Sequence, residues 1–212
     1  MSESIHHQIV IVGGGTAGIT VAARLTKGWF NQRDVAVIEP SNKHYYQPLW
    51  TLVGGGVVKK EVTEHSEASV MPRRAKWIRD GVAEFHPEKN VVVTRGGQAI
   101  TYDWLVVAAG IQINWGKIPG LSESIGKNGV CSNYSYDTVD STWENIRTFR
   151  GDDALFTQPS GAVKCGVHWE FSTFSILPSV GVFIGESRRK ARLIMSYCDA
   201  CSLIDSPCRN AS

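Results

Sequence analysis

Residues 9–25, IVIVGGGTAGITVAARL, determine the architecture predicted for this chain. The first four are all β-branched and apolar, which predicts a strand buried on both faces. Three glycines then allow a sharp turn, and the apolar residues that follow recur at helical spacing. A strand, a glycine-rich turn and a helix in this order are typical of a βαβ unit that binds a dinucleotide diphosphate at the first turn of the helix. The predicted buried face of the helix consists of Ile19, Ala22, Ala23 and Leu25.

An acidic residue at the end of the next strand supports this interpretation. Val35–Ile38 is a second apolar run, and Glu39 closes it. A carboxylate here accepts hydrogen bonds from ribose hydroxyls, so FAD or NAD fits the pattern better than NADP. Glycine-rich loops also form plain turns, but strand, glycines, helix and acid in one unit disfavour that alternative. The residues predicted to contact the dinucleotide are Gly13, Gly14, Gly15, Thr16, Ala17, Gly18 and Glu39.

The composition indicates a globular protein without a nucleic-acid partner. The 212 residues carry a formal net charge of only +2, which gives no basic surface for nucleic acid. The apolar segment 171–184 is short and interrupted by serines and a proline, so we expect no transmembrane helix and at most peripheral membrane contact. The first residues show neither a secretion signal nor a transit peptide. Five scattered cysteines argue against a secreted disulfide scaffold and favour a reducing compartment.

Residues 40–150 predict loops, a β-meander, another buried strand and a helix. The aromatic segment 44–50 predicts a lid or a wall, and glycines 54–56 predict a flexible passage, because no Lys-Ser/Thr pair follows them. Residues 75–102 alternate β-branched segments with turns, which predicts a meander with Val82 on its first strand. Asp137 is expected to cap a helix with Val139, Trp143 and Ile146 on one side.

Together these patterns predict an α/β fold. A Rossmann-like domain with a parallel sheet is expected over residues 8–150, with the small β-meander at 75–102. Residues 151–166 are expected to begin an incomplete second dinucleotide-type domain. The character of the sequence changes after Gly166, and residues 167–212 form a divergent tail without clear periodicity. One hypothesis is that this tail is translated from a retained intron or a shifted frame.

Several motifs together resemble the sulfide:quinone oxidoreductases, particularly the mitochondrial type, within the FAD-dependent pyridine nucleotide-disulfide oxidoreductase-like superfamily. The likeness covers residues 8–166, which correspond to the N-terminal portion of that family. It rests on VGGGTAGIT (12–20), VIEPS (37–41), HYYQPLWTLVG (44–54), DWLVVAAGIQ (103–112), CSNYSY (131–136) and VKCG (163–166). The concatenation is specific, although each piece alone is weak.

The resemblance implies an FAD site and a redox cysteine. Gly13, Gly15 and Gly18 would hold the FAD diphosphate, and Glu39 would hold the adenosine ribose. The Val82 backbone would meet the adenine, Ala109 and Gly110 would pass beside the cofactor, and Gln47 and Pro48 would lie near the isoalloxazine. Sulfide would attack a cysteine disulfide and form a persulfide, and the electrons would pass through flavin to quinone. The mitochondrial inner membrane is the location that the resemblance implies.

Cys165 matches the first redox cysteine of the family and is the predicted catalytic residue. A thiolate is the reactive form of cysteine, and Lys164 with the amides of a glycine-flanked turn would stabilise it. An inert buried cysteine is the alternative interpretation of the same residue. We find no counterpart in this sequence for the partner redox cysteine or for the quinone site of the family. Whether the chain is a complete enzyme therefore stays open.

Three alternatives remain beside the enzymatic reading. The chain could be a non-catalytic FAD-binding fragment, acting by pairing with a full-length relative. A type-II NADH dehydrogenase is disfavoured because 159–162, Pro-Ser-Gly-Ala, stands where a second glycine fingerprint is expected, and proline removes an amide donor. Cys198, Cys201 and Cys208 make only a weak zinc case, because a fourth ligand is not fixed by the pattern. No metal site is predicted.

Overall fold

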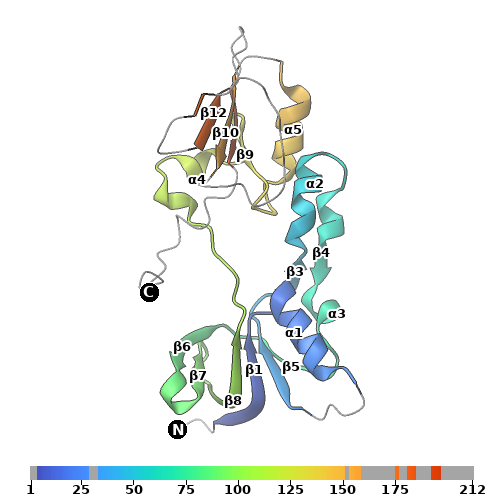
Figure 1. The fold of residues 1–212 in the computed structure, drawn as a ribbon, viewed down its shortest axis with the longest axis vertical. Helices are drawn as coiled ribbons and strands as arrows, with labels where there is room; N and C mark the ends of the chain where they lie inside the picture. Colours follow the sequence, from blue (N-terminus) through green and yellow to red (C-terminus); the bar gives the residue numbers. More distant parts are fainter. Residues whose placement is uncertain are drawn as a thin grey trace. The chain divides into compact units, whose positions relative to one another are not determined.

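The chain divides into two compact units, each with its own sheet (Figure 1). The first unit comprises Met1–Tyr46 and Glu64–Gly110, and the second comprises Gln47–Thr63 and Ile111–Ser212. The computed structural model describes residues 4–28, 33–150, 153–158, 175–176, 181–184 and 192–196. The glycine-rich turn, Glu39 and Val82 lie in the first unit, whereas Gln47 and Pro48 lie in the second.

The first unit contains a six-stranded sheet in the order β5-β2-β1-β8-β7-β6. Strand β1 is parallel to both β2 and β8, and β2 is parallel to β5, while β7 is antiparallel to β8 and β6. These strands are β1 (Ile5–Val12), β2 (Val35–Ile38), β5 (Lys76–Ile78), β6 (Val82–His86), β7 (Val91–Thr94) and β8 (Ala99–Val107). The remaining elements are α1 (Thr16–Thr26), β3 (Lys43–Tyr45), β4 (Glu64–Ser66), α3 (Glu67–Val70) and the 3-10 turn η3 (Pro87–Lys89).

Both faces of this sheet are buried at β1, which explains its continuous apolar run. Alternate residues point to opposite faces, so Val10 and Val12 join one cluster and Ile9 and Ile11 join the other. The first cluster consists of Val10, Val12, Ile38, Val92, Ile100 and Tyr102. The second consists of Ile9, Ile11, Ala22, Val35 and Val37, and it receives helix α1. The predicted α/β class and mostly parallel sheet are confirmed.

The buried face of α1 differs from the prediction. Gly18, Ala22 and Thr26 are buried at a regular spacing of four, whereas Ala23 is exposed and Ile19 is half-buried. A threonine is tolerated in the buried row because its hydroxyl donates to the Ala22 carbonyl at 2.8 Å. Ala22 is buried as predicted and Leu25 packs against the second cluster, so the apolar pattern is wrong mainly at Ala23.

The second unit contains a five-stranded sheet in the order β11-β12-β10-β13-β9. Strands β9, β13 and β10 are mutually parallel, and β12 is antiparallel to β10 and β11. Its strands are β9 (Val130–Ser132), β10 (Asp153–Gln158), β11 (Ser175–Ile176), β12 (Gly181–Ile184) and β13 (Arg192–Ser196). Its helices and turns are η1 (Gln47–Leu49), α2 (Trp50–Gly54), η2 (Lys60–Thr63), η4 (Trp115–Lys117), α4 (Leu121–Ser124) and α5 (Asp140–Thr148). Three of these strands come from the segment after Gly166, for which the sequence predicted no element.

Glycines 54–56 end helix α2, and Gly54 and Gly56 pack closely against other side chains, so the structure has a helix end here instead of the predicted flexible passage. Gly54 ends α2, and Gly55 caps that helix with an N–H donated to Thr51. A Cβ at Gly54 would overlap the Asn133 carboxamide, and one at Gly56 would overlap the Trp143 ring. Gly56 also has a φ of 74°, which favours glycine. These glycines leave room for neighbouring side chains of the same unit.

The aromatic segment 44–50 is divided between the two units. Trp50 is 5% exposed, donates from Nε1 to the Thr63 hydroxyl at 3.1 Å, and lies 6.4 Å from the Tyr136 ring centroid. Trp50 is therefore a core residue of the second unit. Its indole N–H has the partner that burial of a tryptophan requires.

Helix α5 begins three residues later than its predicted cap. Val139 takes the N-cap position without a side-chain cap, so the assignment of Asp137 as the cap is wrong. A tighter turn precedes the helix, because the amides of Ser141 and Thr142 donate to carbonyls only three residues back. Val139 and Thr142 are buried, whereas Trp143 remains 40% exposed.

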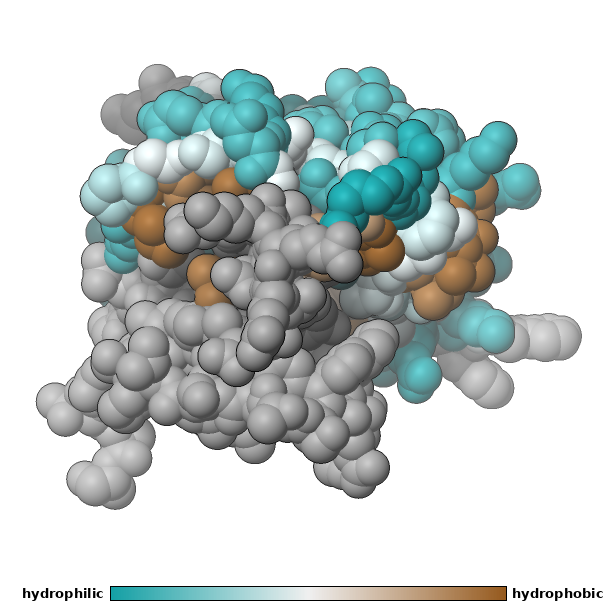
Figure 2. All heavy atoms as spheres, turned by 90° about the horizontal axis from the view of Figure 1, so that it is seen from above, coloured by the Kyte–Doolittle hydropathy of each residue, from teal (hydrophilic) through white to brown (hydrophobic). Residues whose placement is uncertain are grey.

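The surface of the described part mixes polar and apolar side chains, as Figure 2 shows for one face. Val57 and Val62, in the segment between α2 and the end of η2, expose 73% and 59% of their area. Scattered apolar residues of this kind are normal on a folded protein. None of the helices in the described ranges is both long and apolar enough to cross a bilayer.

Candidate dinucleotide-binding site

Gly13 joins the three central strands where β1 ends. Its amide donates to the Ile38 carbonyl at 2.9 Å, and the Ala108 amide donates to the Val12 carbonyl at 2.8 Å. A Cβ at Gly13 would overlap the Ala108 carbonyl, and its φ is 102°. Only glycine combines this backbone conformation with such a close approach of β8. The turn after β1 is therefore fixed between the carboxyl ends of β2 and β8.

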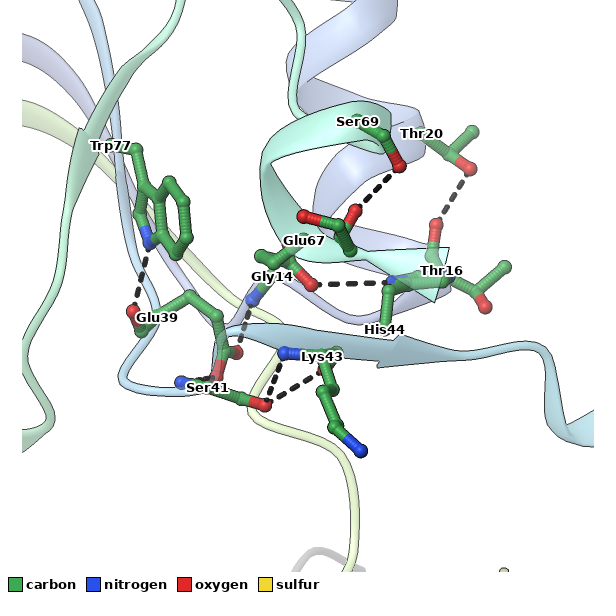
Figure 3. A network of polar contacts seen from close by, with 11 residues as sticks. Gly14, Thr16, Thr20, Glu39, Ser41, Lys43, His44, Glu67, Ser69 and Trp77 are labelled. Atoms are coloured by element: carbon green, nitrogen blue, oxygen red, sulfur yellow. Dashed lines mark hydrogen bonds and ion pairs between the residues drawn. The ribbon is translucent and has the colours of Figure 1, made fainter. Parts of the chain in front are cut away.

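Glu39 is held against the glycine-rich turn by two amides. The Gly14 amide donates to Glu39 Oε2 at 2.7 Å, and the Ser41 amide donates to Oε1 at 2.7 Å (Figure 3). The Trp77 indole N–H donates to the Glu39 backbone carbonyl at 2.8 Å. Charge-assisted bonds from backbone amides fix a carboxylate well, and each oxygen keeps further acceptor capacity. The carboxylate predicted to hold a ribose thus lies beside the turn predicted to hold a diphosphate.

The start of α1 is open on the side where a diphosphate would bind. Gly15, Thr16 and Ala17 are exposed, and a Cβ at Gly15 would meet no atom within 4 Å. The helix has no side-chain N-cap bond and no acidic residue in its first turn. Gly18, by contrast, packs against the Gly13 carbonyl, where a Cβ would overlap it. The first turn therefore offers amides and the positive end of the helix dipole to an anion.

A second acidic residue, Glu67, lies under this turn and was not singled out from the sequence. It is 1% exposed at the start of α3, and its Oε1 lies 2.6 Å from the position that a Cβ of Gly14 would take. His44 Nδ1 lies 3.5 Å from Glu67 Oε2 (Figure 3). Burial, with a smaller contribution from the Glu39 charge, raises the pKa of Glu67 to about 7. No pattern in the sequence distinguishes this acid from an exposed one.

The other predicted contacts are placed as follows. Val82 is the first residue of β6 and packs against the first core cluster. Ala109 and Gly110 directly follow β8, and the Ala109 Cα lies 2.9 Å from the position that a Cβ of Gly13 would take. The structure thus brings the glycine-rich turn, Glu39 and the end of β8 together.

The predicted residues outside the first unit are Gln47 and Pro48, both in η1 of the second unit. Cys165, Cys198, Cys201 and Cys208 lie outside the described residues. Among the residues that are described, no group of three or more His, Cys, Asp or Glu side chains could hold a metal ion.

The residues present fit the diphosphate and ribose of a dinucleotide. Gly15 leaves space for a ligand, and the first turn of α1 has no acidic side chain to repel it. Glu39, at the end of the neighbouring strand β2, can accept hydrogen bonds from ribose hydroxyls. A family model described as pyridine nucleotide-disulphide oxidoreductase matches residues 7–155. The chain belongs to the pyridine nucleotide-disulphide oxidoreductase family.

Comparison with individual proteins shows which members of this family the chain resembles. The chain is 49% identical over 160 residues to the mitochondrial sulfide:quinone oxidoreductase of Dictyostelium discoideum, covering 75% of this chain and 35% of the relative. It is 42% identical over 160 residues to the mouse enzyme of the same name, covering 76% and 35%. These identities confirm the resemblance found in the motifs. The chain spans about a third of the length of these curated relatives.

A solved structure supports the fold. The sulfide:quinone oxidoreductase of Aquifex aeolicus superposes with a TM-score of 0.52 at 22% identity, covering 68% of this chain and 32% of that one. Because the identity is only 22%, this match supports the fold alone. The family and the curated relatives together imply a flavin-dependent class of oxidoreductase.

Proposed function

We propose that the chain binds FAD at the glycine-rich turn and serves sulfide oxidation of the sulfide:quinone oxidoreductase type. The observation that carries the proposal is the cradle itself, an open helix N-terminus with Glu39 bonded to the Gly14 amide at its side. A carboxylate in this position favours an unphosphorylated ribose, as in FAD. The identity to two mitochondrial sulfide:quinone oxidoreductases supports the reaction.

The proposed cofactor contacts are those that the sequence resemblance predicts. The amides at the start of α1 would hold the diphosphate, and Glu39 the adenosine ribose. Val82, at the start of β6, would present its backbone to the adenine. Ala109 and Gly110 would pass beside the cofactor. Gln47 and Pro48, in η1, remain contacts that the sequence resemblance predicts. FAD supplies two-electron acceptance from a thiol and onward transfer to an acceptor.

Cys165 is the proposed redox cysteine. Sulfide would attack a disulfide between Cys165 and a second cysteine, breaking the S–S bond and leaving one sulfur as a persulfide and the other as a thiolate. After a nucleophilic acceptor takes the outer sulfur of the persulfide, the two cysteine thiolates would re-form the disulfide, and the two electrons given up would pass through the cofactor to quinone. Lys164, next to Cys165 in the sequence, would stabilise the thiolate form.

A second candidate function is FAD binding without sulfide oxidation, including pairing with a longer relative. One observation favours it. Within the described part of the chain the one cysteine is Cys131, on β9, and it is fully buried. A thiol that solvent and sulfide cannot reach is a poor partner for disulfide exchange.

The curated relatives are named as mitochondrial proteins, and we propose the mitochondrion as the location of this chain too. Quinone is dissolved in the membrane, so the proposed reaction would need contact with the inner membrane. We propose that this contact is peripheral.

The visible spectrum of the purified protein with added FAD tests the proposal. Flavin bands that bleach with sulfide, and are restored by a quinone, support sulfide oxidation. The Cys165→Ser variant should retain the bands and lose the bleaching, with Cys131→Ser as the matched control that retains both. Bands that never bleach support the second function, and absence of bound flavin at any FAD concentration contradicts both.

A further inference from the structure

Glu67 is a buried carboxyl directly beneath the glycine-rich turn, and none of the proposed cofactor contacts uses it. Its side chain is 1% exposed, and its Oε1 has no hydrogen-bond partner. The Gly14 amide nearby is engaged by Glu39 rather than by Glu67 (Figure 3). A buried acid with one unpartnered oxygen costs stability, which calls for a reason within the site.

The surroundings of Glu67 are acidic on the side of the turn. Glu39 Cγ and Glu67 Oε1 each lie 2.6 Å from the position that a Cβ of Gly14 would take, so the two acids flank the same glycine. On the opposite side, His44 Nδ1 stands 3.5 Å from Glu67 Oε2, beyond hydrogen-bond distance for good geometry. A diphosphate over α1 would bring further negative charge toward this pair.

Other charged groups on the elements around α3 are already engaged or exposed. Lys43 on β3 pairs with Glu64 on β4 at 2.8 Å, and His65 on β4 is exposed. Arg24, in the last turn of α1, is also exposed. Glu39 and His44 are therefore the titratable groups that face Glu67 closely in the described structure.

We propose that Glu67 is a proton-linked positioning residue of the dinucleotide site, which must hold a proton for the diphosphate to bind tightly at the turn of Gly14. The inference rests on the proposed function. When Glu67 is neutral, Glu39 is the only charged acid at Gly14 and can serve the ribose. When Glu67 ionises, two carboxylates flank the glycine and oppose the diphosphate. Burial and the Glu39 charge raise the pKa of Glu67 to about 7, so this change falls within a physiological range.

The direction of the pH dependence follows from linkage. A ligand that favours the protonated form of Glu67 takes up protons from solvent as it binds. Raising the pH from 6 to 8.5 should therefore weaken FAD binding by about tenfold, which corresponds to a ligand-induced pKa change of about one unit.

The test measures the Kd of FAD by flavin fluorescence between pH 6 and pH 8.5 for the wild-type chain, Glu67→Gln and Glu64→Gln. Glutamine at 67 mimics the neutral acid, so this variant should bind FAD with less than twofold change across the range. Glu64→Gln alters a nearby, partly exposed acid and should follow the wild-type chain. His44 remains in all three proteins, so any pH dependence from that residue is common to them.

An equal pH dependence in the wild-type chain and in Glu67→Gln overturns the inference while FAD binding upholds the proposed function. No FAD binding by any of the chains at any pH overturns both. A second measurement needs no variant, in case Glu67→Gln fails to fold. The NMR titration midpoint of the Glu67 carboxyl carbon should rise when FAD binds, and a midpoint that stays or falls overturns the inference.

Discussion

Glycines 13–15 and glycines 54–56 are the same three-residue sequence, and in each run two glycines are closely packed while one has room for a Cβ. In the first unit, a side chain at Gly15 would meet no atom within 4 Å. In the second unit, side chains at Gly54 and Gly56 would overlap Asn133 and Trp143. Gly13 and Gly14 are as tightly packed as Gly54 and Gly56, so the two runs differ at the open glycine. Gly15 faces empty space at the start of α1, whereas a Cβ at Gly55 would lie 3.5 Å from the Thr51 carbonyl of its own helix. A glycine run therefore shows that something approaches the backbone closely, but not what approaches.

The largest effect is expected from Gly13→Ala. A Cβ there would overlap the Ala108 carbonyl on a backbone with a φ of 102°, and the backbone that follows β8 would have to shift. We expect a loss of more than ~3 kcal/mol in the free energy of unfolding, measured by chemical denaturation. Gly97→Ala is the matched control, since it has a φ of 82° but no atom near its Cβ. It should cost about 1 kcal/mol, and equal losses would show that backbone strain alone explains Gly13.

Gly56→Ala should have the next largest effect, because it presses a methyl group against the Trp143 ring at a φ of 74°. We expect a loss of about 2 kcal/mol in the free energy of unfolding. Gly55→Ala is the control, since its nearest neighbour would be 3.5 Å away, and it should change stability by less than about 0.5 kcal/mol. Combining Gly56→Ala with Trp143→Leu should recover part of the loss in a double-mutant cycle. Strict additivity would mean that the ring is not the obstacle.

Glu67→Gln should stabilise the chain without ligand, and only at higher pH. The folded chain holds the Glu67 proton more tightly than the unfolded chain, because burial raises the pKa from 4.5 to about 7. The free energy of unfolding therefore falls as the pH rises from 4.5 to about 7, and it falls no further above that pH. We expect the variant to gain on the order of 1 to 2 kcal/mol at pH 8 and almost nothing at pH 4.5. A gain of the same size at both pH values, in urea titrations, would contradict this origin.

The smallest effect on stability is expected from Gly15→Ala, which separates the two roles of the glycines most sharply. Gly15 has a φ of −65° and an open surface, so alanine should change the free energy of unfolding by less than about 0.5 kcal/mol. The added methyl group would occupy space that the proposed diphosphate needs. We expect the Kd of FAD, from fluorescence titration, to rise at least about tenfold. Unchanged FAD binding would argue against a ligand at this turn.

The first βαβ unit could be predicted because its signals are local. The apolar run of β1, the positive-φ turn at Gly13 and the acid after β2 each leave a mark in consecutive residues. The spacing between Gly18 and Glu39 then follows from the length of one helix and one strand. Sequence reading succeeds where the physical requirement and the residue that meets it are neighbours.

The remainder depended on contacts between distant residues. Thr26 is buried because its hydroxyl bonds to its own helix, which a hydrophobic pattern does not register. Gly54 and Gly56 are explained by Asn133 and Trp143, some eighty residues away in the sequence. Glu67 belongs to the site because α3 places it against Gly14, and an isolated glutamate in the sequence reads as solvated.

Strand β1 pairs with β8 along nearly its whole length, from Ile5 opposite Ile100 to Val12 opposite Val107. During synthesis β1 must therefore wait for β8 to emerge before the carbonyl of Ala108 can close against Gly13. Such long-range parallel pairing forms slowly. Cofactor loading would then be a late event in the maturation of the polypeptide, and chaperones would meet the first unit with its central strand still uncovered.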